Sequence, residues 1–326
     1  MDASKRIAIG IDLGGTNIKA GVVNGKGRML SRDKIETQAQ AGRDAVIDRM
    51  AQIADRVREQ AGLKWEQVEV IGIGSPGPLN PKKGLITFAP NLPGWVNVPL
   101  RDIFEKKLSV KTHVANDANA AAYGEAWVGA GRGTTSMILL TLGTGIGSGV
   151  VLNGRIWDGI DGMAAEIGHM TICYNGVKCA CGNHGCIEAY ASANNMVRRM
   201  KEAIAAGRQS SLAAKAEDGT LTARDIHDAA VAGDRAARAM IEETGMLLGV
   251  ACANLVNIFN PEAILFSGGM ADAGEMLFEP IRKEVKRRAF EPGSSTVRIV
   301  RAALPDVAGT IGAAGCALKI LETSAS

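Results

Sequence analysis

The sequence has little net charge and no long apolar run at its start, and these absences exclude several classes of protein. Its 326 residues carry 37 basic and 34 acidic side chains, a formal net charge of +3. Proteins that bind nucleic acid usually display a basic surplus, which this chain lacks. Residues 1–5 lead into an apolar strand that is too short for a signal peptide, and we expect no apolar stretch of membrane-spanning length. The composition therefore predicts neither a nucleic-acid partner nor a membrane partner.

Cysteine is scarce outside one cluster. The chain has six cysteines, of which three are clustered and the others, Cys173, Cys252 and Cys316, are scattered. Such usage is typical of a reducing compartment, so we expect a cytoplasmic protein. With 46% hydrophobic and 22% charged residues, the composition is that of a globular protein, and the length is sufficient for two domains.

Four potential metal ligands stand close together in the sequence: His169, Cys179, Cys181 and Cys186. Zinc prefers tetrahedral nitrogen and sulfur ligands, and a Cys3His set with no open position is typical of a structural site. A disulfide is disfavoured because two of the cysteines are separated by a single residue, and ordinary buried thiols are the other alternative. We interpret the cluster as a structural zinc site. The flanking carboxylates, Glu166 and Glu188, are then free to bind a polar ligand.

Apolar strands alternate with helical segments along the chain, which predicts an α/β architecture. Strands are expected at residues 6–12, 18–24, 28–35, 68–73, 111–115, 136–142, 150–152, 263–266 and 297–300. Helices are expected at residues 43–61, 100–108, 117–128 and about 308–321, and the region 188–287 is mostly helical. The opening pattern of strand, glycine turn and strand recurs from residue 136, which suggests two related halves facing a cleft.

Glycine-rich turns follow three apolar strands, at residues 12–16, 143–149 and 267–270. Backbone N–H groups bared by glycine, with the hydroxyls of Thr16, Thr144 and Ser148, form a cradle for phosphate oxygens. Asp12 is able to hold magnesium, which favours oxygen ligands. A single turn of this kind is usually only a turn, but three in one chain favour a nucleotide site.

Neither common nucleotide motif accounts for these turns. The Gly-x-x-x-x-Gly-Lys-Ser/Thr pattern is absent. Residues 72–77 match Gly-x-Gly-x-x-Gly, but Pro78 and Pro81 follow at once and cannot open the helix that the dinucleotide motif requires. We therefore interpret this match as accidental.

Asn116 and Asp117 follow the strand expected at residues 111–115. A carboxylate at the end of a strand can take the proton from a substrate hydroxyl as it attacks a phosphoryl group. Asp is also a favoured helix N-cap, and the helix pattern alone favours that interpretation of Asp117. Further amides and carboxylates suited to several sugar hydroxyls at once are Asn91 in the loop 90–95, Glu166, His169 and Glu188.

Taken together, these motifs resemble the ROK family (repressors, open reading frames and sugar kinases). The motifs that carry the resemblance are Asp12-Leu-Gly-Gly-Thr-Asn17, the 90–95 loop, Asn116-Asp117-Ala-Asn119, Leu142-Gly-Thr-Gly-Ile-Gly147, Glu166-Ile-Gly-His169 and Cys179-x-Cys-Gly-x-x-Gly-Cys-x-Glu188. Their order and spacing match over nearly the whole chain. Within the family the sequence is most similar to bacterial ATP-dependent glucokinases.

The resemblance implies an α/β fold of the actin-like, ribonuclease-H-like ATPase type, with two domains around a central cleft. The smaller domain is expected to contain residues 1–115 and a returning helix at about 305–326. The larger domain, residues 116–304, is expected to carry the zinc loop. Family members are often homo-oligomers, so a dimer or tetramer is expected.

The resemblance also implies transfer of the ATP γ-phosphoryl group to the 6-hydroxyl of glucose, with Asp117 as general base, which then outweighs its interpretation as a cap. The expected sugar ligands are Gly77, Asn91, Asn116, Asp117, Glu166, His169 and Glu188. The residues expected to bind ATP and Mg²⁺ are Asp12, Gly14, Gly15, Thr16, Asn17, Lys19, Thr144, Gly145, Gly268 and Gly269. Structural Zn²⁺ is expected on His169, Cys179, Cys181 and Cys186, so His169 serves both metal and sugar.

Several alternatives stay open. The acceptor could be N-acetylmannosamine, N-acetylglucosamine, fructose or another hexose, and the donor could be polyphosphate. A non-catalytic sugar-sensing regulator is a more distant alternative. A transcriptional repressor needs a helix-turn-helix segment ahead of the first strand; only five residues precede that strand, so we expect a kinase.

Overall fold

The computed structural model describes residues 3–89 and 91–324, which form two compact units. The first unit contains the chain up to Thr135, Gly149–Ala165 and the chain from Ala303 onward, and the second contains Ser136–Ser148 and Glu166–Ala302. The domain bounds expected from the sequence stay a prediction. Pro90, the first residue of the loop that carries Asn91, lies outside the described residues.

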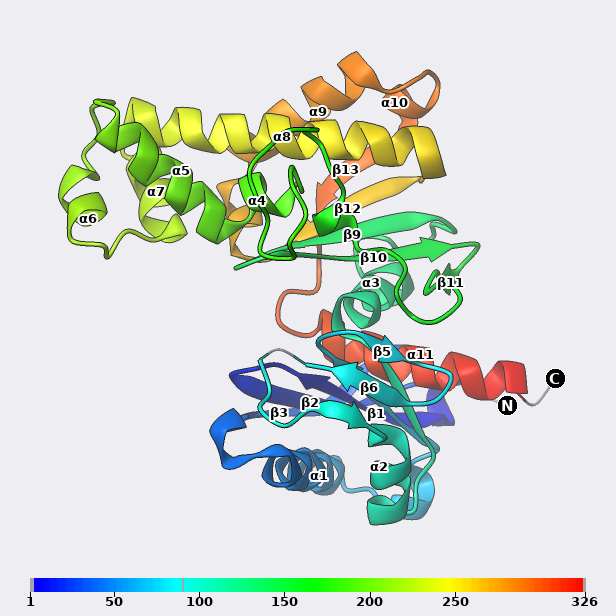
Figure 1. Cartoon of the computed structure of the whole chain (residues 1–326). Coiled ribbons are helices and arrows are strands. Elements are labelled where there is room, and N and C mark those ends of the chain that lie inside the picture. The colour runs from blue at the N-terminus through cyan, green and yellow to red at the C-terminus, as the bar shows by residue number, and fades with distance from the viewer. Residues whose placement is uncertain (1–2, 90, 325–326) are drawn as a thin grey trace. The chain divides into compact units, whose positions relative to one another are not determined.

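The first unit is built on a five-stranded sheet in the order β3-β2-β1-β4-β8 (Figure 1). Its strands are β1 (Ile7–Leu13), β2 (Asn17–Asn24), β3 (Met29–Glu36), β4 (Val70–Ser75) and β8 (Thr112–Asn116). Its α-helices are α1 (Arg43–Gln60), α2 (Leu100–Leu108), α3 (Asp117–Val128) and α11 (Ala308–Ser324), with 3-10 turns at Ala3–Lys5, Ala39–Ala41 and Trp65–Gln67. Strands β1, β4 and β8 run parallel, whereas β2 and β3 are antiparallel to their neighbours.

The strands and helices expected in this unit are confirmed to within about two residues at the strand ends. A second sheet of three short strands was not expected: β5 (Leu79–Asn80), β6 (Leu85–Phe88) and β7 (Val96–Val98). These strands are too short for a period-2 pattern to stand out in the sequence.

Different helices cover the two faces of the first sheet. On one face Ile9 and Ile71 pack in a core with Met50 of α1 and Phe104 of α2. On the other face α11 approaches the strands closely, because Gly72 has no side chain: a Cβ there would lie 1.9 Å from the carbonyl oxygen of Ala313. No helix follows residues 72–77, since β5 comes next. The accidental nature of the dinucleotide match is therefore confirmed.

The second sheet has the order β11-β10-β9-β12-β13. Its strands are β9 (Met137–Leu142), β10 (Ile146–Leu152), β11 (Arg155–Ile156), β12 (Ala263–Ser267) and β13 (Arg298–Arg301); β11 and the end of β10 are counted with the first unit. The helices of the second unit are α4 (Glu188–Ala191), α5 (Ala193–Ala205), α6 (Ala213–Glu217), α7 (Ala223–Val231), α8 (Arg235–Phe259), α9 (Glu275–Arg288) and α10 (Gly293–Thr296), with 3-10 turns η4 (Ile167–His169) and η5 (Gly269–Ala273).

The two sheets share one strand order. β1 corresponds to β9, since each leads through a glycine turn into its neighbour, β2 or β10. On the other side of β1 lie β4 and β8, and on the other side of β9 lie β12 and β13, all parallel to the leading strand. The repeat suggested by the sequence is thus matched by a repeated topology.

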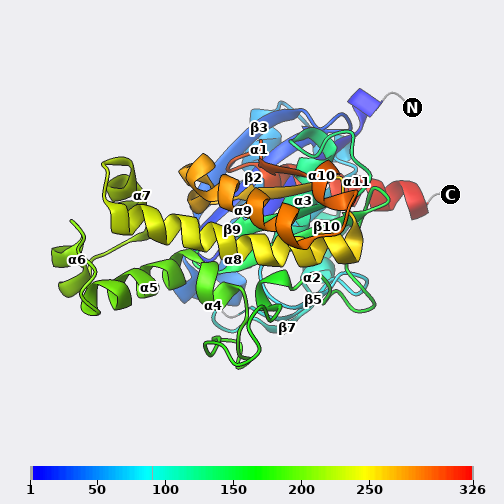
Figure 2. The ribbon, with the colours of Figure 1, turned by 90° about the horizontal axis from the view of Figure 1, so that it is seen from above.

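Helix α8 corrects one expectation. It has 25 residues, and an 18-residue window within it has a mean hydropathy of 1.3, so by length and composition it reaches membrane-spanning size. In the structure 61% of that window is buried, and α8 lies along α9 (Figure 2). This burial is typical of a core helix, and it accounts for the apolar character of α8.

Candidate active site

Asp12, Asn116 and Asp117 stand at the carboxyl edge of the first sheet. Asp12 of β1 lies opposite Gly74 of β4, and Gly74 lies opposite Ala115 of β8. Because neighbouring strands are about 4.8 Å apart, the Cα atoms of Asp12 and Ala115 are separated by about 10 Å. Asn116 and Asp117 follow directly. The structure therefore brings the expected magnesium ligand and the expected base to one edge, the edge where open parallel sheets bind their ligands.

Asn116, rather than Asp117, caps helix α3. The Asn116 Oδ1 atom accepts hydrogen bonds from the backbone amides of Ala118 at 2.9 Å and Asn119 at 3.1 Å. Asp117 is the first residue of the helix, and its Oδ1 accepts from the Ala118 amide at 2.8 Å. The interpretation of Asp117 as the N-cap is therefore wrong, because the side chain of Asn116, one position earlier, already accepts from two of the free N–H groups at the start of α3.

Asp12 lies in a partly apolar environment. Burial raises the pKa of its carboxyl above the ordinary value, and the positive charge of Lys19 opposes this rise. A Cβ on Gly309, in the first turn of α11, would lie 2.9 Å from the Asp12 Cγ, so glycine at that position makes room for the carboxylate. Lys19 Nζ also lies 3.4 Å from Asp306 Oδ1. A half-buried carboxylate of this kind is an oxygen ligand suited to magnesium, directly or through water.

A backbone hydrogen bond holds the glycine turn of residues 12–16, and the loop that carries Asn91 packs against it. The Gly14 amide donates to the carbonyl oxygen of Asn17 at 2.9 Å, and the Thr16 side chain is exposed. A Cβ on Gly15 would lie 3.3 Å from the Cβ of Asn91, so the structure brings these two predicted site residues together.

Gly77 allows its own backbone and that of Phe88 to lie close together in the first unit. Its φ is +85°, and a Cβ there would lie 2.2 Å from the carbonyl oxygen of Phe88. A side chain is therefore excluded by the fold itself. The assignment of Gly77 as a sugar ligand stays a prediction.

Two glycine turns of the second unit meet in one pocket. β9 and β12 are adjacent parallel strands in which Thr141 lies opposite Ser267, so their turns leave the same edge of the sheet. Gly268 has a φ of +90°, and a Cβ there would lie 2.3 Å from the carbonyl oxygen of Leu142. The pocket has a volume of about 360 Å³, and its lining includes Gly143, Thr144, Gly269, Met270, Arg224 and His227. A cavity that joins two bare-backbone turns to apolar walls is suited to a nucleotide.

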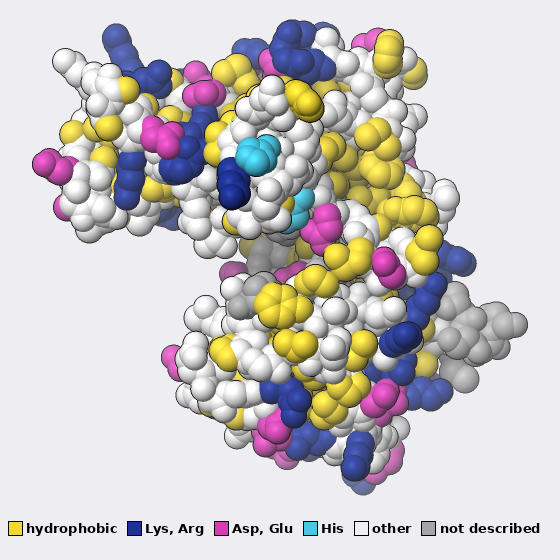
Figure 3. All heavy atoms as spheres, in the orientation of Figure 1, with side chains coloured by type: hydrophobic (Ala, Val, Ile, Leu, Met, Phe, Trp, Pro, Cys, Tyr) yellow, Lys and Arg dark blue, Asp and Glu magenta, His cyan; other side chains and the backbone are white. Residues whose placement is uncertain are grey.

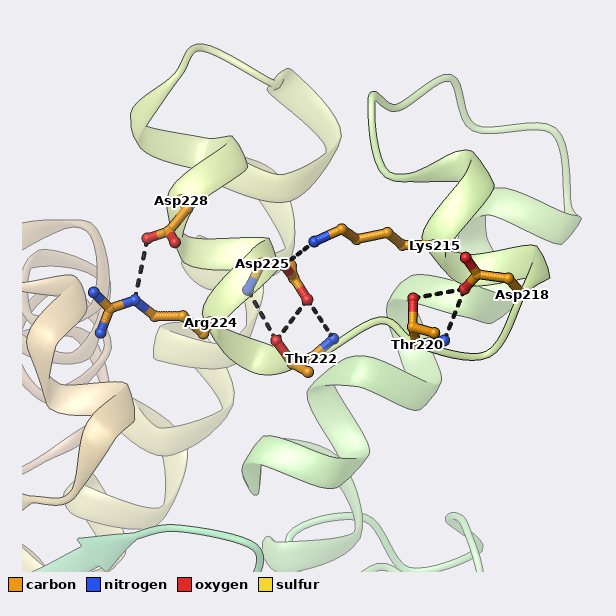
Figure 4. Close-up of polar contacts among 7 residues, drawn as sticks. All are labelled: Lys215, Asp218, Thr220, Thr222, Arg224, Asp225 and Asp228. Carbon is orange, nitrogen blue, oxygen red and sulfur yellow. Dashed lines mark hydrogen bonds and ion pairs between the residues drawn. The ribbon is translucent and has the colours of Figure 1, made fainter.

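Helix α7 forms one wall of this pocket and is held by its own cap. The Thr222 Oγ1 atom accepts from the Asp225 amide at 3.2 Å, and Asp225 Oδ2 accepts from the Thr222 amide at 2.9 Å (Figure 4). Lys215 of α6 pairs with the same carboxylate. The hydrogen bond from Lys215, followed by those from Thr222, lowers the pKa of Asp225 to about 2.

Arg224 and His227 are pocket residues that sequence reasoning missed. Arg224 Nε lies 3.4 Å and His227 Nδ1 lies 3.1 Å from Asp228 Oδ1 on the same helix. Their spacing on one amphipathic helix gives no local signal of a binding role, because the turns that they face lie elsewhere in the sequence.

The three expected sugar ligands of the second unit gather at the start of β10. The Ile146 amide donates to Glu188 Oε2 at 2.7 Å. The turn η4, which carries His169 and follows Glu166, packs there as well, since a Cβ on Gly168 would lie 2.2 Å from the Ile146 carbonyl oxygen. The structure therefore places these three side chains on segments tied to the same strand.

Ser148 belongs to this anchoring rather than to the phosphate cradle. Its side chain is buried, and its Oγ accepts a hydrogen bond from the Ile167 amide at 3.1 Å. The sequence pattern placed Ser148 in the second of the three glycine turns, but its hydroxyl accepts from the segment that carries Glu166 and His169 and holds that segment on β10.

The four expected metal ligands come together in the structure. The ligand atoms of His169, Cys179, Cys181 and Cys186 all lie within 4.8 Å of one another. The Cys181 and Cys186 sulfurs are 3.8 Å apart, and Cys179 Sγ lies 3.8 Å from His169 Nδ1. Two thiolates on a tetrahedral zinc ion are also about 3.8 Å apart, given Zn–S bonds of about 2.3 Å. All six cysteines are free, so the disulfide alternative is excluded.

The expected sugar ligands belong to both units. Gly77, Asn91, Asn116 and Asp117 lie in the first, and Glu166, His169 and Glu188 lie in the second. Each group is described within its own unit, and their joint binding of one sugar stays a prediction.

The repeated sheets and their glycine turns define a protein of the actin-like, ribonuclease-H-like ATPase fold. The ROK family matches residues 8–320, and the chain belongs to this family. A glucokinase from Thermotoga maritima is 40% identical over 94% of this chain and 95% of its own length. The ROK family glucokinase of Streptomyces griseus, solved in complex with glucose and AMPPNP, has a TM-score of 0.79 and 36% identity, with 96% and 99% of the two chains covered. A xylose repressor from Caldicellulosiruptor bescii is 31% identical over 93% of this chain and 76% of its own length.

Proposed function

We propose that this protein transfers the γ-phosphoryl group of ATP to the 6-hydroxyl of glucose, with Asp117 as general base. The observation that carries the proposal is the position of Asp117 at the carboxyl end of β8, on the sheet edge that also holds Asp12. Similarity to glucokinases over nearly the whole chain supports glucose as acceptor and ATP as donor.

The chemistry depends on alignment and charge stabilisation. Asp117 accepts the proton of the sugar hydroxyl as the hydroxyl attacks, which contributes roughly 10²- to 10⁴-fold to the rate. Backbone amides of the glycine turns donate to phosphate oxygens and stabilise their charge. Asp12 is the residue that would hold magnesium, an ion that neutralises phosphate charge when bound.

We infer that the sugar hydroxyls bind a mixed set of amides and carboxylates. The amide groups of Asn91 and Asn116 offer both donors and acceptors, whereas the carboxylates of Glu166 and Glu188 each accept from two hydroxyls. The bond between Glu188 and the Ile146 amide supports this role, because it orients the carboxylate.

We also infer that His169, Cys179, Cys181 and Cys186 hold a structural zinc ion. The 3.8 Å separation of two of the sulfurs supports this assignment. A filled Cys3His set has no open position, so the ion fixes the loop that bears the second-unit sugar ligands rather than taking part in phosphoryl transfer.

A cytoplasmic homo-oligomer without nucleic-acid or membrane partners is proposed as the working form. The free thiols support a reducing compartment. On the face drawn in Figure 3, acidic and basic side chains of the described residues are interspersed, unlike the single-sign surface that binds phosphate backbones. The dimeric or tetrameric state rests on the family resemblance alone.

The test of the proposal is ATP-dependent phosphorylation across glucose, mannose, fructose, N-acetylglucosamine and N-acetylmannosamine, with polyphosphate as a second donor. A strong preference for glucose with ATP is expected. Preference for an N-acetylated sugar would keep the kinase mechanism and overturn glucose as the substrate. Sugar binding without turnover on any member of the panel would favour the non-catalytic sugar-sensing alternative.

Replacement of the base separates chemistry from binding. Asp117→Asn should lower kcat by about 10²- to 10⁴-fold while the Kd for glucose changes little, because the amide keeps the shape but accepts no proton. Asp161→Asn, at an exposed aspartate of the same unit, is the control and should keep the wild-type kcat. Turnover retained by Asp117→Asn would rule out its role as base.

A further inference from the structure

A second pocket lies in the first unit and shares no lining residue with the glycine turns. It has a volume of about 250 Å³ and is formed by residues of β5, β8, β11, α3 and α11 (Figure 1). Apolar side chains such as Leu79, Ile156 and Ile320 supply most of its walls. Of the residues assigned to the proposed sugar, nucleotide and zinc sites, Asn116 alone lines this cavity.

A buried amide oxygen without a partner lines this pocket. Asn119 is 5% exposed, and its Oδ1 atom has no hydrogen-bond partner among the described residues. Buried polar atoms in folded proteins are nearly always paired, so an unpaired one indicates a group that a ligand or water satisfies. A ligand hydroxyl that donates to Asn119 Oδ1 would remove this deficit.

Two neutral polar side chains lie beside Asn119 in the lining. Burial, followed by the positive charge of Arg101, lowers the pKa of His113 to about 4, so this imidazole is neutral at physiological pH. Burial raises the pKa of Tyr123, so its phenol keeps its proton. Asn119, His113 and Tyr123 are therefore uncharged lining residues that offer both donors and acceptors.

Three charged residues line the pocket: Arg155, Lys319 and Asp158. Lys319 pairs with Glu322 at 3.2 Å. Arg155 is exposed, and it has no ion pair or side-chain hydrogen bond within the described part of the chain. A guanidinium in this position is ready to pair with an anionic group at the pocket mouth.

The pocket also touches the helix that carries Asp117. Asn116 lines it, and the same side chain accepts from the first amides of α3. A ligand there contacts the cap of the helix on which the proposed base is the first residue. Any effect of such a ligand on glucose phosphorylation rests on the proposed function, whereas its binding does not.

We propose that this pocket is a second small-molecule site, which takes a small hydroxy acid with an apolar body. The apolar walls enclose the body, the Asn119 Oδ1 atom accepts from the hydroxyl, and Arg155 pairs with the carboxylate at the mouth. The occupant is distinct from the sugar and from the nucleotide, because neither of those carries an apolar body joined to a carboxylate.

The test is a titration followed by protein NMR, without ATP or glucose, using 4-hydroxyphenylacetate as the probe. Saturable binding is expected. Arg155→Ala should weaken it about tenfold, the size of one charge-assisted hydrogen bond. Arg132→Ala, at an exposed arginine outside the lining, is the matched control and should leave the Kd unchanged. Because Arg155 is exposed, its replacement should also leave the melting temperature unchanged.

Matched probes identify the two ends of the ligand. Asn119→Ala should weaken 4-hydroxyphenylacetate and leave phenylacetate unaffected, and the uncharged 4-hydroxyphenylacetamide should be insensitive to Arg155→Ala. The proposal is overturned if Arg155→Ala binds the acid as well as the wild type, if glucose displaces the probe, or if about 10 mM probe shows no saturation. A positive titration in a protein that phosphorylates no sugar would leave this site standing and overturn the proposed function alone.

Discussion

At the scale of single residues, Asp12 and Asp117 occupy the same sheet edge in different environments. Asp12 packs against Gly309, where burial raises its pKa. Asp117 lies in the first turn of α3, and the side chain of the preceding Asn116 forms the N-cap of that helix. The first environment suits a carboxylate that meets a cation, and the second places the proposed base at the start of a helix.

Asp12→Asn should raise the melting temperature at about pH 7 while activity is lost. The folded-state pKa of Asp12 lies above its unfolded value of about 3.9, so the folded state binds this proton more tightly than the unfolded state. Its contribution to stability is therefore present below the unfolded pKa and is lost as pH rises through the folded pKa. The gain in melting temperature of Asp12→Asn over the wild type should be largest near neutral pH and should shrink toward about pH 4.

Melting temperatures of the wild type and Asp12→Asn across this pH range test the idea. Asp44→Asn is the control, because a hydrogen bond from Arg43 lowers the pKa of Asp44, the opposite direction. Asp44→Asn should show no gain in melting temperature at neutral pH. An equal gain in both variants, or a gain that does not change with pH, would contradict the argument.

If the proposed zinc site is correct, Cys181→Ser should lower the zinc content of the protein and weaken glucose binding. Loss of an outer-shell partner lowers metal affinity roughly 10- to 100-fold. Loss of a direct ligand should lower it further. Cys173→Ser is the matched control, since Cys173 is an exposed cysteine of the same loop outside the ligand cluster. Metal analysis and calorimetry with glucose measure the two effects. Normal glucose affinity in zinc-free protein would separate the metal from the sugar site.

At the scale of elements, the buried side chain of Glu125 joins α3 to the segment that leads into α11. Its Oε2 accepts from the amides of Ala130 at 2.8 Å and Ala303 at 3.0 Å, and its Oε1 accepts from the Leu304 amide at 2.6 Å. Glu125 is fully buried. Helix packing in the first unit therefore depends on one carboxylate, and no sequence pattern identified it.

Glu125→Ala should lower the free energy of unfolding by about 3 kcal/mol, because three backbone amides lose their buried acceptor at about 1 kcal/mol each. Glu125→Gln keeps one carbonyl oxygen and should lose less. Glu66→Ala, at an exposed glutamate of the same unit, is the control. Denaturant unfolding measures the change, and equal stability of Glu125→Ala and the control would disprove the role.

Local patterns predicted most elements and the residues of the metal cluster, because periodicity, turn residues and ligand spacing are properties of short segments. The first-unit helices and strands are confirmed, as is the accidental match at residues 72–77. The short strands β5, β6 and β7 were missed for lack of length. Arg224, His227 and Glu125 were missed because their partners or neighbours in space lie far along the chain.

At the scale of the whole molecule, the two sheets repeat one topology, and each unit carries its own part of the chemistry. The first unit contains Asp12 and Asp117. The second contains the pocket of the two glycine turns, the Cys/His cluster and three of the expected sugar ligands. None of the residues that line this pocket is an expected sugar ligand, so we expect nucleotide binding and sugar binding to be separable by mutation.

Ala273→Trp should fill the proposed nucleotide pocket of the two glycine turns, which Ala273 lines, and abolish ATP binding while glucose binding is retained. For the wild type, AMPPNP at about 100 times its Kd should stabilise the protein by about 2.7 kcal/mol. This stabilisation should vanish in the variant. Ala239→Trp, on the exposed face of α8, is the size-matched control. Loss of glucose binding in Ala273→Trp, measured by calorimetry, would contradict the separation.

By itself the sequence predicted the strands and helices, the glycine turns and the Cys/His cluster, because each depends on residue types at short spacings. Asp117 as candidate base came from the family resemblance, since the local pattern alone favoured a helix cap. Only the tertiary structure decided that the turns after β9 and β12 share a pocket, that Ser148 anchors the segment carrying Glu166 and His169, and that Glu125 holds the segment that leads into α11. The physical reason is that a hydrogen bond or a cavity wall depends on distance in space. Glu125 and Leu304 are 179 positions apart in the chain, yet they lie 2.6 Å apart in the fold.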